Sequence, residues 1–154
     1  MLVFCFKVAL DHNKRIYRNI EIIGNQNLDD LHEEIFSAFD RDVEHLYSFY
    51  LTKKPTKSKH SRRQAPEYTE LVYVDDNPFF TTKTKYDSSS TKIQELDLKI
   101  QEKFYYLFDF VDEWWHELTL LSVKKINSVK GRYPKIVKTV GNSPDQYPDY
   151  DEYE

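Results

Sequence analysis

Residues 104–118, FYYLFDFVDEWWHEL, place one histidine and four carboxylates among aromatic side chains. An imidazole beside a carboxylate can transfer protons near neutral pH, and an imidazole with carboxylates can bind a divalent metal ion. The residues that could act as catalysts in this way are His116, Asp112 and Asp109. The alternative interpretation is a buried strand pair in which the histidine is a hydrogen-bonded part of an aromatic layer.

A metal site has less support from residue spacing. The five histidines are far apart in the sequence, and none has the i, i+4 or short-loop spacing of a local metal site. A site could still form where a helix packs on the aromatic segment, with His32, His45 and His116 as candidate ligands. We prefer the interpretation of His116 as scaffold, so no metal or other cofactor is predicted.

A second candidate site is the segment Lys53–Ala65, KKPTKSKHSRRQA, which has no acidic and no large apolar residue. Its cations could contact phosphates of a nucleic acid, with Tyr47 or Tyr68 stacking on bases. The alternative, which we prefer, is a solvated connection, because this composition offers no core face. The cations are Lys53, Lys54, Lys57, Lys59, Arg62 and Arg63.

Composition excludes several classes of protein. The single cysteine, Cys5, excludes an internal disulfide framework and a multi-cysteine zinc site. Three glycines leave little room for a phosphate-binding loop, and a net charge of −4 gives no overall attraction to nucleic acid. No signal peptide and no apolar run near the ~20 residues of a membrane span is found. We therefore expect a cytoplasmic protein without a membrane partner.

Residue periodicity indicates the elements that must position these side chains. Apolar residues alternate through residues 2–10 and 15–23, which predicts two strands forming a hairpin. Asn27 can cap an amphipathic helix over residues 28–39, because its apolar side chains follow the 3.6-residue period. Residues 45–52 alternate again and predict a third strand, so the chain opens in β-β-α order.

One domain is expected over residues 1–141, followed by an acidic, disordered tail at residues 142–154. Polar composition predicts mobile loops at about residues 53–66 and 75–90. Three further elements are predicted: a short edge strand at residues 70–74, one or two helical turns at residues 91–96, and a last strand or extended segment at residues 132–140.

The aromatic segment predicts a hairpin whose register decides which residues share a face. With a three-residue loop at residues 111–113, Phe108 pairs with His116, and every second residue from Phe104 to Leu120 forms one nearly apolar face. A four-residue loop would scatter the apolar side chains over both faces. Burial, at about 25 cal/mol per Å² of apolar surface, favours the first register. Asp109 and His116 then point to opposite sides, which disfavours an Asp–His dyad.

The run FDFVDEWWHEL resembles the signature of the Ri-plasmid open-reading-frame-three-like family, in which tyrosine, aspartate, phenylalanine, glycine and aspartate precede tryptophan and histidine. RIYRNIEI, LHEEIFSAF, HLYSF and RYPK resemble its other conserved elements, so the resemblance covers nearly the whole chain. Val111 departs from the pattern, because it stands where the family has glycine and a β-branched residue resists positive φ. The matching residues are Phe108, Asp109, Phe110, Asp112, Trp114, His116, Tyr133 and Pro134.

The resemblance implies a small α+β domain, linked to mobile elements, whose relatives also carry insertion-element passenger and resolvase-type names. The predicted fold class is α+β: a mainly antiparallel sheet with the β-β-α opening, one principal amphipathic helix packed on the sheet, and a C-terminal aromatic hairpin.

Our functional hypothesis is a non-enzymatic interaction domain that binds a protein or a nucleic acid through its basic loop and an exposed sheet face. The alternative is a metal-dependent hydrolase or nucleic-acid-processing enzyme with a site around His116 and Asp112. No pattern in the sequence determines the oligomeric state.

Overall fold

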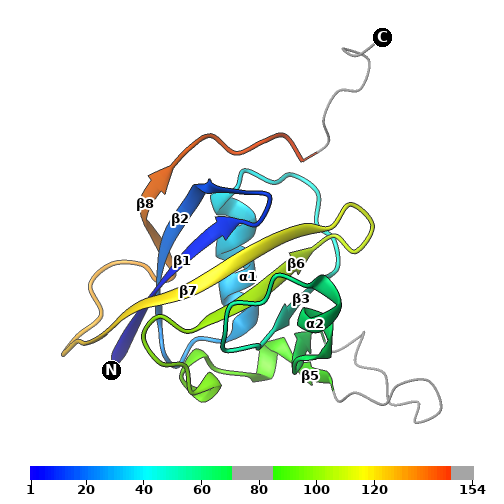
Figure 1. Cartoon of the computed structure of the whole chain (residues 1–154). Coiled ribbons are helices and arrows are strands. Elements are labelled where there is room, and N and C mark those ends of the chain that lie inside the picture. The colour runs from blue at the N-terminus through cyan, green and yellow to red at the C-terminus, as the bar shows by residue number, and fades with distance from the viewer. Residues whose placement is uncertain (71–84, 147–154) are drawn as a thin grey trace.

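A computed structural model describes residues 1–70 and 85–146 of the chain (Figure 1). Its strands form one eight-stranded sheet in the order β5-β4-β3-β6-β7-β1-β2-β8. The strands are β1 (Leu2–Leu10), β2 (Asn13–Ile23), β3 (Tyr47–Tyr50), β4 (Glu67–Thr69), β5 (Lys85–Asp87), β6 (Lys103–Phe108), β7 (Trp114–Lys125) and β8 (Lys135–Val140). The helical elements are α1 (Leu28–Ala38), α2 (Lys59–Gln64) and the 3₁₀ turns η2 (Ser88–Ser90) and η3 (Ile93–Leu96).

The predicted fold class is wrong for this sheet. The sheet is mixed, because β4 and β5 run parallel. Far more of the described residues lie in strands than in helices. The aromatic hairpin is also not an appendage, since β6 and β7 lie at the centre of the strand order. Alternation in a sequence indicates which residues share a face, but it does not reveal the direction or order of neighbouring strands.

The opening hairpin and the helix form as their patterns predict. Asn27 caps α1 by accepting from the N–H of Asp30, whose carboxylate accepts from the N–H of Asn27 in return. Leu31 and Ile35 of α1 are buried against the face of the sheet that carries Phe6. The turns η2 and η3 belong to the same layer, in which Ser88, Ile93 and Leu96 are buried. Figure 1 shows α1 behind the sheet.

The aromatic hairpin has the predicted faces but a different register. Phe108 pairs with Trp114, and Tyr106 pairs with His116, so the predicted pairing of Phe108 with His116 is wrong by two residues. A slip of two residues leaves the side chains of β6 and β7 on their predicted faces, because strand side chains alternate with a period of two, whereas Asp109 and Phe110 become part of the turn. The cause lies in the turn: Asp109 adopts a φ of 64°, and its carboxylate accepts from the N–H groups of Val111 and Asp112.

The basic segment is not the loop that its composition predicts. It contains α2, and Arg62 of α2 is only 2% exposed on the sheet face opposite α1. The Arg62 guanidinium lies 3.8 Å from the ring centre of Tyr105 and 5.1 Å from that of Trp115. It also donates to both carboxylate oxygens of Asp11, at 2.9 and 3.0 Å. An arginine thus fills the core position that an apolar side chain would normally take.

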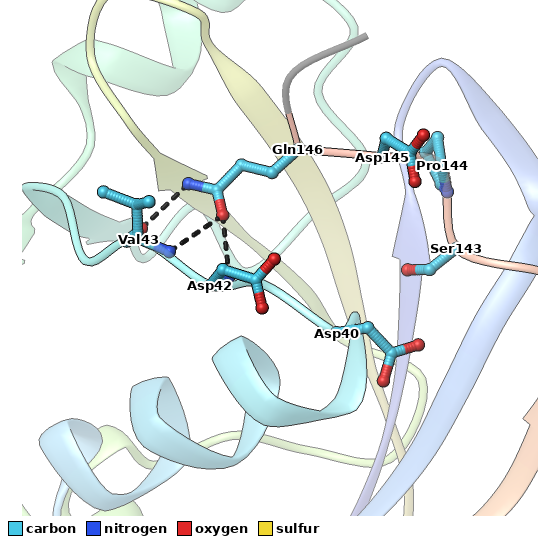
Figure 2. A pocket seen from close by; sticks show the side chains of 7 residues that line it. All are labelled: Asp40, Asp42, Val43, Ser143, Pro144, Asp145 and Gln146. Atoms are coloured by element: carbon cyan, nitrogen blue, oxygen red, sulfur yellow. Dashed lines mark hydrogen bonds between the residues drawn. The ribbon is translucent and has the colours of Figure 1, made fainter. Parts of the chain in front are cut away.

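The start of the predicted tail is attached to the domain. The side chain of Gln146 accepts from the N–H groups of Asp42 and Val43 and donates to the carbonyl of Val43 (Figure 2). Ser143 donates to the carbonyl of Phe39, at the end of α1. The rest of the tail, the expected strand beyond Glu70 and the expected loop before Lys85 lie outside the described residues.

Other late elements agree with the patterns. The helical turn predicted at residues 91–96 is η3, and the alternative of a last strand at residues 132–140 is realised as β8. Among the described residues, no helix has the length and apolarity required to cross a bilayer.

Replacing Arg62 tests whether α2 is part of the core. Arg62→Ala should lower the free energy of unfolding by about 2–3 kcal/mol, because it removes a stacked cation and leaves the Asp11 carboxylate without its buried partner. The measurement is urea denaturation followed by circular dichroism. Arg63→Ala is the matched control, since the neighbouring Arg63 is largely exposed and should cost much less. Equal stability of the two variants would contradict a structural role for Arg62.

Candidate functional site

His116 occupies the centre of the fold, beside a buried arginine. Its side chain is fully buried, and its Nε2 lies 2.8 Å from Nη2 of Arg41. Because a guanidinium can only donate, Nε2 accepts this hydrogen bond, and the proton is on Nδ1, which lies 3.3 Å from the carbonyl oxygen of Tyr106. Both imidazole nitrogens therefore have protein partners.

Arg41 is held by aromatic rings instead of a carboxylate. Its guanidinium carbon lies 5.3 Å from the ring centre of Phe39, 4.9 Å from that of Phe108 and 5.4 Å from that of Trp114. Burial lowers the pKa of Arg41 to about 10, so it stays charged at neutral pH. Burial, followed by the charge of Arg41, keeps the pKa of His116 well below its usual range. His116 is therefore a neutral hydrogen-bond acceptor.

The predicted catalytic residues are not brought together. Asp112 is exposed in the hairpin turn, and within residues 1–70 and 85–146 no hydrogen bond or ion pair links it to His116. Asp109 is buried, but its carboxylate shapes the turn and lies 3.5 Å from Nε2 of His45. The geometry thus offers no support for a metal-dependent enzyme around His116 and Asp112.

The other signature residues also have structural partners. The carbonyl of Tyr133, which precedes Pro134, accepts from the Gln26 side chain at 2.9 Å. Phe108 and Trp114 form the aromatic shell of Arg41, whereas Phe110 is partly exposed. Val111, at the family's glycine position, is 89% exposed.

The turn avoids the strain expected at Val111, because positive φ values fall on Asp109 and Glu113 and not on Val111. The turn of this chain therefore differs from one that needs glycine at that position.

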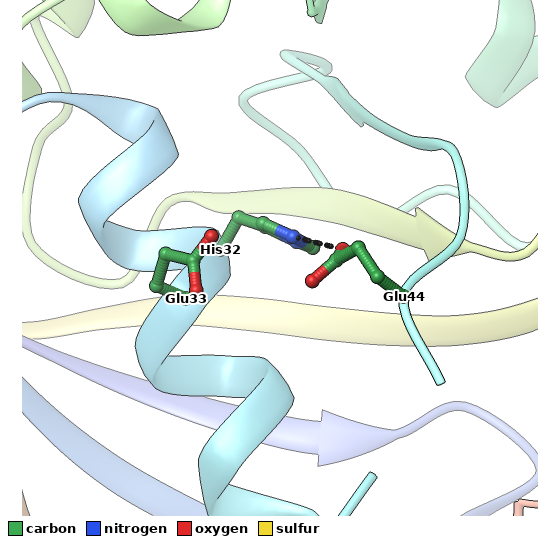
Figure 3. A group of neighbouring side chains, drawn as sticks. All are labelled: His32, Glu33 and Glu44. Carbon is green, nitrogen blue, oxygen red and sulfur yellow. Dashed lines mark hydrogen bonds and ion pairs between the residues drawn. The ribbon is translucent and has the colours of Figure 1, made fainter. Parts of the chain in front are cut away.

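Of the three histidines considered as metal ligands, only His32 lies in a group of possible donors among residues 1–70 and 85–146. One of its ring nitrogens and one carboxylate oxygen each of Glu33 and Glu44 lie within 4.8 Å of one another (Figure 3). His45 and His116 are engaged elsewhere, by Asp109 and Arg41. The sequence shows Glu33 next to His32, which indicates one possible pair of metal ligands. It does not indicate Glu44, because the place of Glu44 depends on the path of the chain after α1.

A row of positive charge crosses the sheet on the side opposite α1. Strand register places five residues side by side in one row: Lys103 on β6, Thr119 on β7, Lys7 on β1, Asn19 on β2 and Lys138 on β8. Every second strand therefore contributes a lysine, with a spacing of about 10 Å because neighbouring strands lie about 4.8 Å apart.

The aromatic ring of Tyr17 lies beside two lysines of this row. Its ring lies 4.4 Å from Nζ of Lys7 and 5.6 Å from Nζ of Lys138. We call this surface the basic sheet face. Its lysines are Lys7, Lys14, Lys103, Lys124, Lys135 and Lys138.

Acidic groups on the same side are mostly paired. Glu117 lies between Lys14 and Lys103, at 3.0 and 3.3 Å from their ammonium groups. Across β6, β7, β1, β2 and β8, Glu21 is the other carboxylate that the strand register places on this face. Six lysines against two glutamates leave a net positive surface.

The basic segment lies on the same side, because Arg62 of α2 packs on Tyr105 and Trp115 of that sheet face. Two of its six predicted anion-binding residues donate to carboxylates of the domain. Arg62 donates to Asp11, and Arg63 donates to Glu113 at 2.7 Å. Nζ of Lys53 donates to the carbonyl of Asp97. The exposed remainder is Lys54, Lys57 and Lys59.

Comparison with known proteins agrees with the signature in the aromatic hairpin. The family model described as plasmid pRiA4b ORF-3-like protein matches residues 3–150. The chain belongs to this family. The plasmid pRiA4b ORF-3-like match spans the opening hairpin, α1 and the aromatic hairpin. No curated protein matches the chain.

A solved structure shares the fold of this plasmid pRiA4b ORF-3-like chain. It is the protein of unknown function MM3350 from Methanosarcina mazei Go1, with a TM-score of 0.68 and 19% sequence identity. The alignment covers 94% of this chain and 72% of MM3350. The likeness establishes a common architecture, and it brings no assigned function with it.

The buried His116 should make stability depend on pH. Its folded pKa is depressed, so its contribution is complete above the unfolded value of about 6.5 and is lost as pH falls below it. Between pH 6.5 and 5, the free energy of unfolding should fall by up to about 1.4 kcal/mol per pH unit from this group.

Urea denaturation at several pH values measures this slope. His116→Gln keeps an acceptor for Arg41 but cannot titrate, so it should flatten the slope, whereas the exposed His60→Gln should leave it unchanged. A slope that is the same in His116→Gln and in the unmodified chain would show that His116 does not cause it.

Proposed function

We propose that this mobile-element-associated domain is a non-enzymatic interaction module that binds nucleic acid through the basic sheet face. The observation that carries the proposal is the row of Lys103, Lys7 and Lys138 across β6, β1 and β8. Lysines act on phosphates as point charges, so a regular row attracts a polyanion without reading its sequence. The exposed lysines of the basic segment belong to a stretch that packs on the same side of the sheet.

The distribution of charge supports this orientation. The opposite side of the molecule carries the acidic first turns of α1, with Asp29, Asp30, Glu33 and Glu34. The net charge of −4 therefore conceals a positive face and a negative face. Such a separation orients an approaching polyanion toward the lysines and repels it from the helix side.

Tyr17 favours nucleic acid over an acidic protein as the partner. A tyrosine ring next to two lysines can stack on a base while the ammonium groups contact the flanking phosphates. Because stacking accepts any base, we expect little sequence preference and a preference for single strands. An acidic protein surface would satisfy the lysines but would not require the ring.

Salt-dependent binding tests the proposal. A fluorescent single-stranded oligonucleotide should bind the purified domain, with affinity that falls steeply as salt rises. Lys7→Gln with Lys138→Gln should weaken binding roughly tenfold at low salt, and should lower the slope of log affinity against log salt by about 1.4, since each phosphate contact in a single strand contributes about 0.7.

The matched control is Lys92→Gln with Lys125→Gln. It removes the same charge, but Lys92 lies beside the start of α1, and the register places Lys125 on the side of the sheet that carries Phe4 and faces α1. This control should bind like the unmodified domain. Absence of binding at low salt, or equal loss in both double variants, would refute a nucleic-acid site on the basic sheet face.

A further inference from the structure

We propose a second site on the other side of the molecule, where His32, Glu33 and Glu44 bind a divalent transition-metal ion. Their donor atoms lie within 4.8 Å of one another. Ligands at about 2.0–2.2 Å from one ion are separated by roughly 3–3.5 Å, so rotation of the two exposed glutamates would complete the set. Figure 3 shows the His32 ring and the Glu44 side chain meeting between α1 and the segment that follows it, with Glu33 beside them on α1.

The buried imidazole distinguishes this group from an ordinary acidic patch. His32 is 1% exposed, and its ring stacks on that of Tyr47 at 3.7 Å, which fixes its plane. Its Nε2 is directed toward Glu44, at 2.7 Å, and the Glu44 carboxylate is half exposed. The imidazole is therefore held by the core while its Nε2 faces a half-exposed carboxylate.

Tyr106 provides the partner that a metal-binding imidazole needs. Its hydroxyl is buried in the core and lies 2.6 Å from Nδ1 of His32. A neutral hydroxyl can donate to Nδ1 or accept from it. Without metal, Nε2 can carry the proton and donate to Glu44. With metal, the proton can move to Nδ1, where Tyr106 accepts it, and Nε2 is free to bind the ion.

Among the described residues, the lining of the adjoining concavity, which has a volume of about 330 Å³, includes no lysine or arginine. A divalent ion bound by Glu33 and Glu44 would offset the repulsion among the carboxylates that line this concavity. The lining residues are Asp29, Glu33, Glu44, Glu70, Asp87, Ser88 and Ser89.

The donor set indicates the class of ion. One imidazole with carboxylates suits Zn²⁺, Fe²⁺ or Mn²⁺ better than Mg²⁺ or Ca²⁺, which prefer oxygen ligands alone. Neither the basic sheet face nor its proposed function is needed for this site, because the two lie on opposite sides of the sheet.

Titration calorimetry with Zn²⁺ alone, and separately with Mg²⁺, tests the site on the full chain. One Zn²⁺ per chain should bind, with Mg²⁺ at least tenfold weaker, and Zn²⁺ should raise the thermal unfolding midpoint. His32→Gln and Glu44→Gln should each weaken Zn²⁺ binding at least tenfold. Since His32 is buried, circular dichroism must confirm that His32→Gln folds; if it does not, the half-exposed Glu44→Gln decides.

Glu34→Gln is the matched control. It removes one carboxylate from the next position of α1, but the Glu34 side chain faces Arg132. It should bind Zn²⁺ like the unmodified chain. No Zn²⁺ binding, binding that persists in Glu44→Gln, or equal affinity for Mg²⁺ would each overturn the proposal.

Discussion

Cation stacking on both faces of the β6–β7 hairpin is the interaction on which the rest of this fold depends. On the helix side, Arg41 lies among Phe39, Phe108 and Trp114. On the other side, Arg62 lies on Tyr105 and Trp115. A desolvated guanidinium is stable only where its charge and N–H groups are met, and here aromatic faces, the imidazole of His116 and the carboxylate of Asp11 meet most of them. These contacts fix α2 and the end of α1 relative to the central strands.

This constraint explains why the most conspicuous motif of the chain is scaffold. His116 cannot serve as a base or a metal ligand while it accepts from Arg41 and donates to a carbonyl. The signature of the plasmid pRiA4b ORF-3-like family therefore encodes the centre of the sheet. Features suited to binding lie away from it: a row of lysines on one side and a histidine with carboxylates on the other. The lysines and the two glutamates are at least partly exposed, whereas His32 is buried and turns one ring nitrogen toward Glu44.

The success and failure of the sequence predictions follow from the range of the interactions involved. The opening hairpin, α1 and the apolar face of β6 and β7 were predictable, because periodicity and capping act between residues close in sequence. The exact pairing of Phe108 was not predictable, because the two registers place the same residues on each face and differ only in the geometry of the turn. The hydrogen bonds of Asp109 stabilise the turn of the observed register. Arg62 was misjudged because its burial depends on Asp11 and Tyr105, which are remote in the chain.

The sequence by itself determined which residues share a strand face, where α1 begins, and to which family the signature points. It also identified His32 as a possible ligand and the charge of the basic segment. Only the tertiary structure decided which charges are buried, which lysines stand in one row and which carboxylates surround His32. The physical reason is that charge pairing and burial depend on strand order and register, which are set by contacts between distant segments and leave no periodic trace in the chain.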